Sequence, residues 1–424
     1  MHSPLNCWEV GIEARDWLEK NMKLGFCLSA FVMGCFMTVS ITAKAPSNST
    51  ALDAIAITLN EATQTPVNFT RQDSIMEIVK RPYGATSDGK SVTQYICRNA
   101  NGYVLEMIDY GATVTAFRAP DKHGNVENIT LGCTSMEGYE ACTSYFGSTV
   151  GRFCNRIANG RFSIDGNEYR LATNNGDHHL HGGNKGFDKR IWQAEKVLDN
   201  NAKFVGLRFT LVSDDGDEGY PGRLNVAVEY VLNNDNELKI EFTASTDRPT
   251  HVNLTNHNYW NLAGAGSGRI DEHVLKIEAD QIVTVDDQSI PTGELLAVEG
   301  TPFDFRTESK IGARLHEIKS DPVGYDHNYV LRSGGGELDL AATIRCVETG
   351  RKMEIHTTQP GIQFYSGNFL DGQPGSGGFN QHGALCLETQ HFPDAPNQPS
   401  FASTLLNPGD TYRQTTVHKF SVEK

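Results

Sequence analysis

Apolar and polar residues alternate along much of the chain after Ile75, which is the pattern of β-strands that turn one face towards a core. Two such runs flank Asp165 and Gly166, and this dipeptide predicts a hairpin. A longer run, residues 223–232, is followed by the polar turn residues 233–235 and by a second alternating run. The expected core-facing residues of these two longer strands are Leu224, Val226, Val228, Tyr230, Leu232, Leu238, Ile240 and Phe242.

The same pattern indicates the fold class. No long stretch has helical periodicity, and the chain has no internal repeat and no run of like charges. Residues 75–424 are therefore expected to form one all-β domain of mostly antiparallel strands with few short helices. A large sandwich is the natural architecture for such a domain, and its turns and loops are where a binding site would be built.

The first 45 residues differ from this domain. Residues 22–45 begin with Lys23, continue with a long apolar run and end in the small residues AKA, which is the layout of a secretory signal peptide. Met22 would then be the initiator, and we expect an exported protein, periplasmic or secreted. The alternatives are a membrane anchor, or a cytoplasmic protein whose apolar run is not a functional signal. Residues 46–74 are rich in Ser, Thr, Asn and Ala, which favours a disordered linker.

Charge and cysteine content narrow the possible partners. The net charge of −15, without a basic stripe, argues against nucleic acid and anionic membranes. The nine cysteines form no CxxC pair and no zinc spacing, so we interpret most of them as small buried hydrophobes. A disulfide within the domain stays open as an alternative if the protein is exported.

The chain lacks several common catalytic motifs: a phosphate-binding Walker loop, GxGxxG, the GxSxG elbow and HExxH. We therefore expect no cofactor and no metal. What remains are clusters rich in amides, histidines and aromatic residues. Amides with aromatic rings suit sugars, which need many hydrogen bonds and an apolar stacking face. The six clusters are residues 151–162, 174–183, 253–262, 324–329, 361–372 and 384–401.

The first two clusters contain residues with more than one interpretation. Arg156, beside Asn155, either braces a loop or donates hydrogen bonds to a sugar hydroxyl. His178 and His179 are adjacent and would point to opposite faces of a strand, which disfavours a metal site. The glycines at 182–183 would let a ligand approach the backbone closely.

Two further residues stand out for acid–base chemistry. Glu388 follows the apolar run 384–387, and a carboxylate on a buried strand is costly unless it has partners or a function. His257 lies among amides and aromatic rings with no acid or base beside it. The local sequence leaves this imidazole as a structural group, a metal ligand or an acid held against a polar ligand.

Together the six clusters resemble the aldose 1-epimerase (galactose mutarotase) family, in the family's order and at compatible distances, over residues 76–424. The segments 213–222 and 405–422 look like family segments as well. The resemblance implies a β-supersandwich that interconverts the α and β anomers of free aldohexoses such as D-glucose and D-galactose. It implies His257 as the general acid and Glu388 as the general base. The residues that it implies for holding the sugar are Asn155, Arg156, His181, Tyr259, Asp326 and Gln363.

Anomer exchange needs one base and one acid on different oxygens of one sugar. A proton leaves the C1 hydroxyl while another reaches the ring oxygen, and the open aldehyde rotates about C1–C2 before the ring closes. Each such group is worth about 10²- to 10⁴-fold in rate. Because an unperturbed histidine has a pKa of about 6.5, we expect a carboxylate, with Asp326 a candidate, to help keep one histidine charged. Without the family, the sequence does not rank His181 against His257.

Three other functions compete with this one. A sugar-binding protein without catalysis has no need of both Glu388 and His257. A glycoside hydrolase needs two carboxylates about 5 to 9.5 Å apart, and Asp326 with Glu388 is the pair that the chain offers. A hexose-6-phosphate epimerase needs a cluster of cations for the phosphate, which Arg156 alone does not provide. We expect a monosaccharide as the partner of a monomer or dimer.

Overall fold

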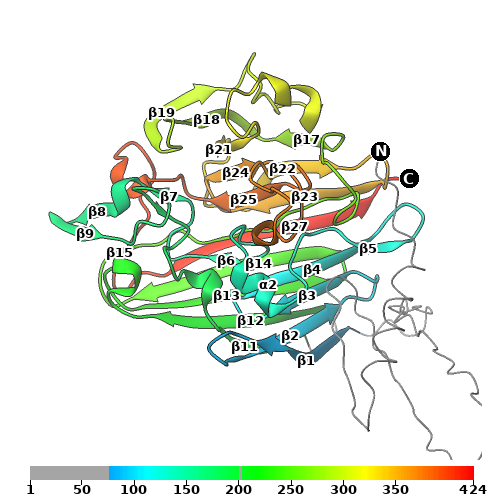
Figure 1. Ribbon diagram of the computed structural model, residues 1–424, viewed down its shortest axis with the longest axis horizontal. Helices are drawn as coiled ribbons and strands as arrows, with labels where there is room; N and C mark the ends of the chain where they lie inside the picture. The colour runs from blue at the N-terminus through cyan, green and yellow to red at the C-terminus, as the bar shows by residue number, and fades with distance from the viewer. Residues whose placement is uncertain (1–75, 200–202) are drawn as a thin grey trace, which may run out of the picture. The chain divides into compact units, whose positions relative to one another are not determined.

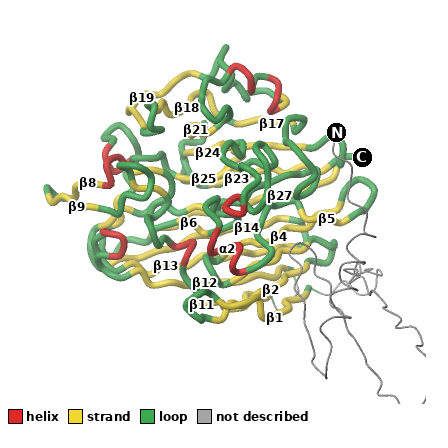
Figure 2. The backbone as a smooth tube through the Cα atoms, in the orientation of Figure 1, coloured by secondary structure: helices red, strands yellow, loops and turns green. Residues whose placement is uncertain are grey.

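Antiparallel strands carry the fold (Figures 1 and 2), in a computed structural model that describes residues 76–199 and 203–424. These residues lie in one contact-dense unit, Asp73–Lys424. The expected signal segment and linker, residues 22–45 and 46–74, fall outside the described residues. The one α-helix of the described ranges is α2 (Met136–Ala141), so the all-β prediction is confirmed. No helix in these ranges has the length and apolar character that crossing a bilayer would require.

A nine-stranded sheet runs through the middle of the molecule in Figure 1. Its long strands alternate between a buried and a more exposed face, as the sequence predicts. In order across the sheet, its strands are β11 (Gln193–Leu198), β12 (Phe204–Ser213), β13 (Leu224–Asn233), β14 (Glu237–Thr246), β27 (Tyr412–Val422), β23 (Arg351–Thr357), β22 (Asp339–Arg345), β17 (Val274–Ile277) and β20 (Ser309–Lys310).

Two five-stranded sheets complete the main framework. The N-terminal one, blue to cyan in Figure 1, consists of β1 (Glu77–Ala85), β2 (Ser91–Arg98), β3 (Val104–Ile108), β4 (Thr113–Pro120) and β5 (Val126–Asn128). The other consists of β19 (Pro291–Ala297), β18 (Ala279–Val285), β21 (Asp326–Leu331), β24 (Gly361–Tyr365) and β25 (Cys386–Gln390).

Short strands pair in the connections between these sheets. The predicted hairpin at Asp165–Gly166 forms, and both of its turn residues have positive φ, 52° and 80°. The four short pairs are β8 (Arg161–Ile164) with β9 (Asn167–Arg170), β10 (His179–Leu180) with β7 (Arg156–Ile157), β16 (Thr255–Asn256) with β6 (Thr149–Val150), and β15 (Thr250–His251) with β26 (Leu405–Leu406).

One large apolar core joins the three main sheets. Phe117 of β4 stacks on Phe420 of β27 with ring centroids 4.3 Å apart, and Trp260 meets Phe117 edge-on at 5.8 Å. Every residue that the sequence assigns to the core of β13 and β14 is at most 3% exposed. Burial of this size is the main stabilising contribution to such a domain, at about 25 cal/mol per Å² of apolar surface.

Candidate active site

The register of β21, β24 and β25 lines up polar side chains in two rows across one face of their sheet. Asn328, Gln363 and Glu388 stand directly opposite one another in the first row. The second row lies two residues away from the first along each strand. It consists of Asp326, Tyr365 and Cys386. Since side chains two apart share a face of a strand, both rows point to the same side.

Several atoms in these rows are buried without a protein partner. They include Glu388 Oε2, Gln363 Oε1 and both polar side-chain atoms of Asn328. Gln363 uses its Nε2 to donate to Asp326 Oδ1 at 2.7 Å. Buried polar atoms in folded proteins normally have hydrogen-bond partners, so unpaired ones gathered on one face indicate a place for a polar ligand.

His257 reaches this face because the segment after β16 runs along β25. Thr255 donates its hydroxyl hydrogen bond to the carbonyl of Thr389 at 2.9 Å, and Trp260 exchanges two backbone hydrogen bonds with Leu385. Between these anchor points, His257 Nε2 lies 3.5 Å from Glu388 Oε1, and both side chains are almost fully buried. The two predicted acid–base residues therefore share one site, although they are far apart in the sequence.

The imidazole of His257 is held from several sides. Its Nδ1 lies 3.5 Å from Cys386 Sγ. The ring of Tyr259 stacks nearly parallel to it, with centroids 5.1 Å apart and an interplanar angle of 18°. Tyr259 is only 3% exposed and packs against Phe146 and Tyr365, so its first role in this structure is to support the imidazole.

His181 enters the site from the loop after β10. Its Nδ1 accepts a hydrogen bond from the main-chain N–H of Asn155 at 3.1 Å, which places the proton of the neutral ring on Nε2. The His181 ring lies 5.2 Å from that of His257 in an edge-on arrangement. Burial, and after it the charges of His257 and Arg156, lower the pKa of His181. Arg156 donates from Nε to Asn175 Oδ1 at 3.2 Å, which braces the loop.

Hydrogen bonds from a neighbouring segment hold the loop that carries His181. The carboxylate of Glu218 accepts hydrogen bonds from the main-chain N–H groups of Asn184 and Lys185, both at 2.9 Å. Arg152, 2% exposed, donates to the carbonyls of Pro221 and Gly222 nearby. The segment 214–222, which contains Glu218, Pro221 and Gly222, therefore helps to position this loop.

Burial governs the charge states at the centre. It lowers the pKa of His257 to about 4. Burial, and secondly the charge of Asp326, raise the pKa of Glu388 well above its usual value. The expectation that Asp326 keeps a histidine charged is therefore wrong, because desolvation dominates at His257 and the Asp326 carboxylate acts on Glu388 and Gln363 instead. Between these two pKa values the pair of His257 and Glu388 holds a single proton.

Two further expectations about the 174–183 cluster are settled by packing. A side chain at Gly182 would collide with the carbonyl of Gly151, and one at Gly183 would collide with Glu218, so both glycines allow close approach of protein atoms rather than of a ligand. His178 and His179 have separate structural partners: Gln288 for the first, and Tyr220 with the carbonyl of Ala172 for the second.

A metal ion fits this centre poorly. One ligand atom from each of His257, Cys386 and Glu388 lies within 4.8 Å of the others. The imidazole, however, turns Nδ1 towards Cys386 and Nε2 towards Glu388. In the neutral imidazole only one ring nitrogen offers an in-plane lone pair to a metal, because the other carries the proton. The arrangement suits proton exchange better than coordination.

Sequence reasoning missed four residues of this site. Asn328, Tyr365 and Cys386 lie two positions from Asp326, Gln363 and Glu388, and strand alternation was the signal that would have found them. The fourth is Tyr145, whose ring lies 4.7 Å from His181 and 5.8 Å from His257. Its backbone has a positive φ of 56°, which nothing in its local sequence indicates.

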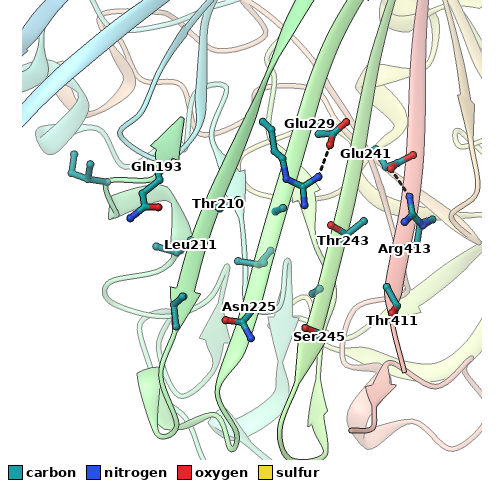
Figure 3. Close-up of a pocket in the computed structure, with 16 residues that line it drawn as sticks. Gln193, Thr210, Leu211, Asn225, Glu229, Glu241, Thr243, Ser245, Thr411 and Arg413 are labelled. Carbon is teal, nitrogen blue, oxygen red and sulfur yellow. Dashed lines mark hydrogen bonds and ion pairs between the residues drawn. The ribbon is translucent and has the colours of Figure 1, made fainter. Parts of the chain in front are cut away.

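An open groove of about 790 Å³ lies elsewhere, on the more exposed face of the nine-stranded sheet (Figure 3). None of the eight sequence-predicted site residues lines it. Its charged groups already pair with each other, Arg208 with Glu229 and Arg413 with Glu241, as the dashed lines in Figure 3 mark. We therefore assign the chemistry to the face of β21, β24 and β25.

The profile of one protein family, described as aldose 1-epimerase, matches residues 93–419. The chain belongs to the aldose 1-epimerase family. The match spans all six polar clusters and includes both His257 and Glu388, and it ends within the family-like segment 405–422.

Curated members of the aldose 1-epimerase family align over nearly their whole length. A galactose mutarotase from Bos taurus is 44% identical over 351 residues, which cover 82% of this chain and 100% of that protein. The human galactose mutarotase is 42% identical, covering 81% and 99%. An aldose 1-epimerase from Escherichia coli K12 is 38% identical, covering 79% and 97%.

Solved structures of the aldose 1-epimerase family have the same fold. A galactose 1-epimerase from Lactobacillus acidophilus superposes with a TM-score of 0.72 at 27% identity, covering 82% of this chain and all of that one. An aldose epimerase homologue from C. elegans gives a TM-score of 0.69 at 31% identity, again covering 82% and 100%. The predicted galactose mutarotase-like architecture is thereby confirmed.

Proposed function

We propose that this protein is an aldose 1-epimerase, an isomerase that interconverts the α and β anomers of free aldohexoses such as D-glucose and D-galactose. The observation that carries the proposal is the 3.5 Å approach of His257 Nε2 to Glu388 Oε1 in a buried site. Membership in a family whose curated relatives are galactose mutarotases and aldose 1-epimerases supports it.

Glu388 removes the proton from the C1 hydroxyl, and His257 delivers one to the ring oxygen. Burial favours the neutral form of the free pair, with the proton on Glu388 and a neutral imidazole. Transfer of that proton to His257 produces the carboxylate base and the imidazolium acid in one step. The pair keeps the same total of one proton in both forms, so it returns to its starting state after ring closure.

A bound sugar makes this transfer favourable. Its hydroxyl groups supply hydrogen bonds to Glu388 Oε2 and Gln363 Oε1, which are buried and unpaired without it. Hydrogen bonds to a carboxylate stabilise its charged form and lower its pKa. The substrate thereby prepares its own general base, and each correctly placed acid or base then contributes about 10²- to 10⁴-fold in rate.

The remaining residues of the site orient the sugar. His181 presents its Nε2–H to the same region as His257 and shares contact with the ring oxygen. Arg156, Asp326 and Gln363 bind hydroxyl groups around the ring. Asn155 positions His181 through its main-chain N–H, and Tyr259 supports His257 from its face. No cofactor is needed, because ring opening requires only proton transfers.

Polarimetry of freshly dissolved α-D-galactose or α-D-glucose tests the proposal directly. We expect the full chain to speed the approach to the anomeric equilibrium far above the buffer rate. A protein that binds these sugars without altering that rate is a sugar-binding protein, which contradicts the proposal. Release of the aryl group from an aryl galactoside would instead indicate a glycoside hydrolase, for which Asp326 would have to supply the second carboxylate.

Export and assembly are separate proposals. The layout of residues 22–45 supports a cleaved signal peptide and a periplasmic or secreted enzyme without a stable membrane partner. We expect a monomer or dimer that acts on a monosaccharide and binds no nucleic acid. N-terminal sequencing of the mature protein tests export, since a start at or near Met1 or Met22 contradicts cleavage. Sedimentation tests the assembly state.

A further inference from the structure

Cys386 and Glu388 lie two residues apart on β25, and each contacts a different nitrogen of the His257 ring. Nδ1 lies 3.5 Å from Cys386 Sγ, and Nε2 lies 3.5 Å from Glu388 Oε1. Side chains two apart on a strand point to the same side, so one strand contacts both edges of the imidazole. The proposed proton transfer uses only Nε2, which leaves the contact at Nδ1 without a role.

We propose that Cys386 is a positioning residue: its sulfur accepts a hydrogen bond from Nδ1–H of His257 and thereby leaves Nε2 free to take the proton of Glu388. In a neutral histidine, the hydrogen bond made by one ring nitrogen determines which nitrogen carries the proton. The inference rests on the proposed function, and it concerns the tautomer of the ring rather than a contact with the sugar.

The direction of this hydrogen bond follows from the state of Glu388. Burial, and secondly the charge of Asp326, raise the pKa of Glu388 well above its usual value, so the carboxyl group of the free pair carries the proton. If the thiol donated to Nδ1, the ring proton would lie on Nε2, which could not then take a second one. With the ring proton on Nδ1, the O–H bond of Glu388 breaks as an N–H bond forms at Nε2, and the carboxylate gains the negative charge.

A thiol suits this task because its sulfur is a weak hydrogen-bond acceptor. Burial raises the pKa of Cys386 well above its usual value, so the group beside Nδ1 is the neutral thiol. A carboxylate at this position would stabilise the imidazolium and hold the proton on His257 before the sugar binds. The neutral sulfur selects the tautomer while the pKa of the imidazole stays at about 4.

The aromatic neighbours of the imidazole fix its plane but not the order of its nitrogens. The rings of Tyr145 and Tyr259 lie nearly parallel to it, at interplanar angles of 21° and 18°. His181, the other titratable neighbour, meets it edge-on with ring centroids 5.2 Å apart. Stacking does not distinguish one ring nitrogen from the other, whereas the contacts of Cys386 and Glu388 do.

Nitrogen NMR of the full chain labelled with ¹⁵N-histidine tests the tautomer. The chain has 14 histidines, so the signals of His257 are identified by their absence from the His257→Asn protein. Without sugar at neutral pH, we expect a protonated Nδ1 and an unprotonated Nε2 in the wild type. In Cys386→Val, which fills a similar space without an acceptor, the proton should move to Nε2. A wild-type ring with its proton on Nε2, or an unchanged tautomer in Cys386→Val, would overturn the assignment.

Kinetics separate positioning from packing. In Cys386→Val we expect kcat for mutarotation to fall by about tenfold, the effect of losing one hydrogen bond, with little change in KM. Cys386→Ser restores an acceptor and should recover most of kcat, although its buried hydroxyl should make it the less stable variant in urea. A purely structural cysteine predicts the opposite order of activity. Cys346→Val changes another buried cysteine, outside the site, and should keep both the rate and the tautomer.

These outcomes distinguish the inference from the proposed function. A wild type that does not speed mutarotation contradicts the proposed function, and the NMR comparison still decides whether Cys386 sets the tautomer. A normal rate in Cys386→Val, or a serine variant no more active than the valine variant, contradicts the positioning role and leaves the proposed function standing. Should a variant fail to fold, the wild-type spectrum alone contradicts the inference if Nδ1 carries no proton.

Discussion

His257 and Glu388 meet at 3.5 Å in a site where burial shifts their pKa values in opposite directions. The imidazole becomes a weaker base and the carboxyl group a weaker acid, so the free pair holds its one proton on Glu388. Environments that push the pKa values of two neighbouring groups apart are typical of acid–base pairs. In the proposed mechanism, movement of this one proton between the two groups lets the pair serve both directions of a reversible ring opening.

Glu388→Gln should abolish catalysed mutarotation and leave sugar binding intact. The amide keeps the shape of the side chain but cannot take a proton, so a loss of at least about 10²-fold is expected. Polarimetry measures the rate, and calorimetric titration with galactose measures binding. Glu294→Gln, at an exposed position of β19, is the matched control and should keep the full rate. A near-normal rate in Glu388→Gln would exclude this residue as the base.

The pH dependence of kcat/KM should show a broad plateau with two falling limbs. Below about pH 4 both members of the pair are protonated, because the pKa of His257 is about 4, and the base is lost. Above the raised pKa of Glu388 the pair has no proton left, and the acid is lost. His257→Asn should lose most of the rate at every pH. An acid limb centred near pH 6.5 in the wild type would contradict the buried, neutral imidazole.

Tyr145 should matter through its ring rather than its hydroxyl group. Tyr145→Phe keeps the ring beside His181 and His257 and should retain nearly full activity. Tyr145→Ala removes it and should lower kcat/KM by about tenfold or more, because small displacements of catalytic groups are costly. Tyr145→Gly suits the positive φ of 56° and separates ring loss from backbone strain. Equal losses in Phe and Ala variants would contradict a packing role.

Chelation should leave the activity unchanged. The centre is arranged for proton exchange between His257 and Glu388, and a mutarotase needs no electrophile besides its acid. The polarimetric rate should therefore be the same before and after dialysis against EDTA. Loss of activity that returns on addition of a divalent cation would show that His257, Cys386 and Glu388 hold a metal after all.

Phe117→Ala should destabilise the protein by about 3 to 5 kcal/mol, the usual cost of emptying a fully buried aromatic site. Phe117 is 0% exposed and stacks on Phe420. Phe369→Ala is the matched control, since Phe369 is 61% exposed, and it should cost under about 1 kcal/mol. Urea unfolding followed by tryptophan fluorescence measures both. Similar midpoints for the two variants would contradict the assignment of the core.

Strand alternation predicted the hairpin at Asp165–Gly166 and the core faces of β13 and β14, because local geometry alone decides which side chains turn inward. The residues brought together at the site were predictable only by resemblance to a family. Their meeting depends on the register of three strands and on the segment of His257 running along β25. Both are long-range pairings that periodicity does not encode.

The electrostatics could not be predicted for a related reason. The charge of His257 depends on how completely the site excludes water, and a neighbouring carboxylate such as Asp326 loses its effect when desolvation is larger. Tyr145 escaped notice because its contact with the histidines follows from a left-handed backbone conformation. The roles of Gly182 and Gly183 depended on which backbone packs against them.

The two polar rows on β21, β24 and β25 leave the alternate positions of the same strands, such as Ile362, Phe364 and Leu387, to the apolar core. If the rows bind the sugar as proposed, folding and sugar preference fall to different residues of one strand. Replacement of a row residue such as Asn328 is then expected to change which hydroxyl pattern is accepted while the interior stays as it is. This separation gives the scaffold room to diversify among aldoses by single substitutions, whereas inserting one residue into β24 would exchange the two sets and destroy both.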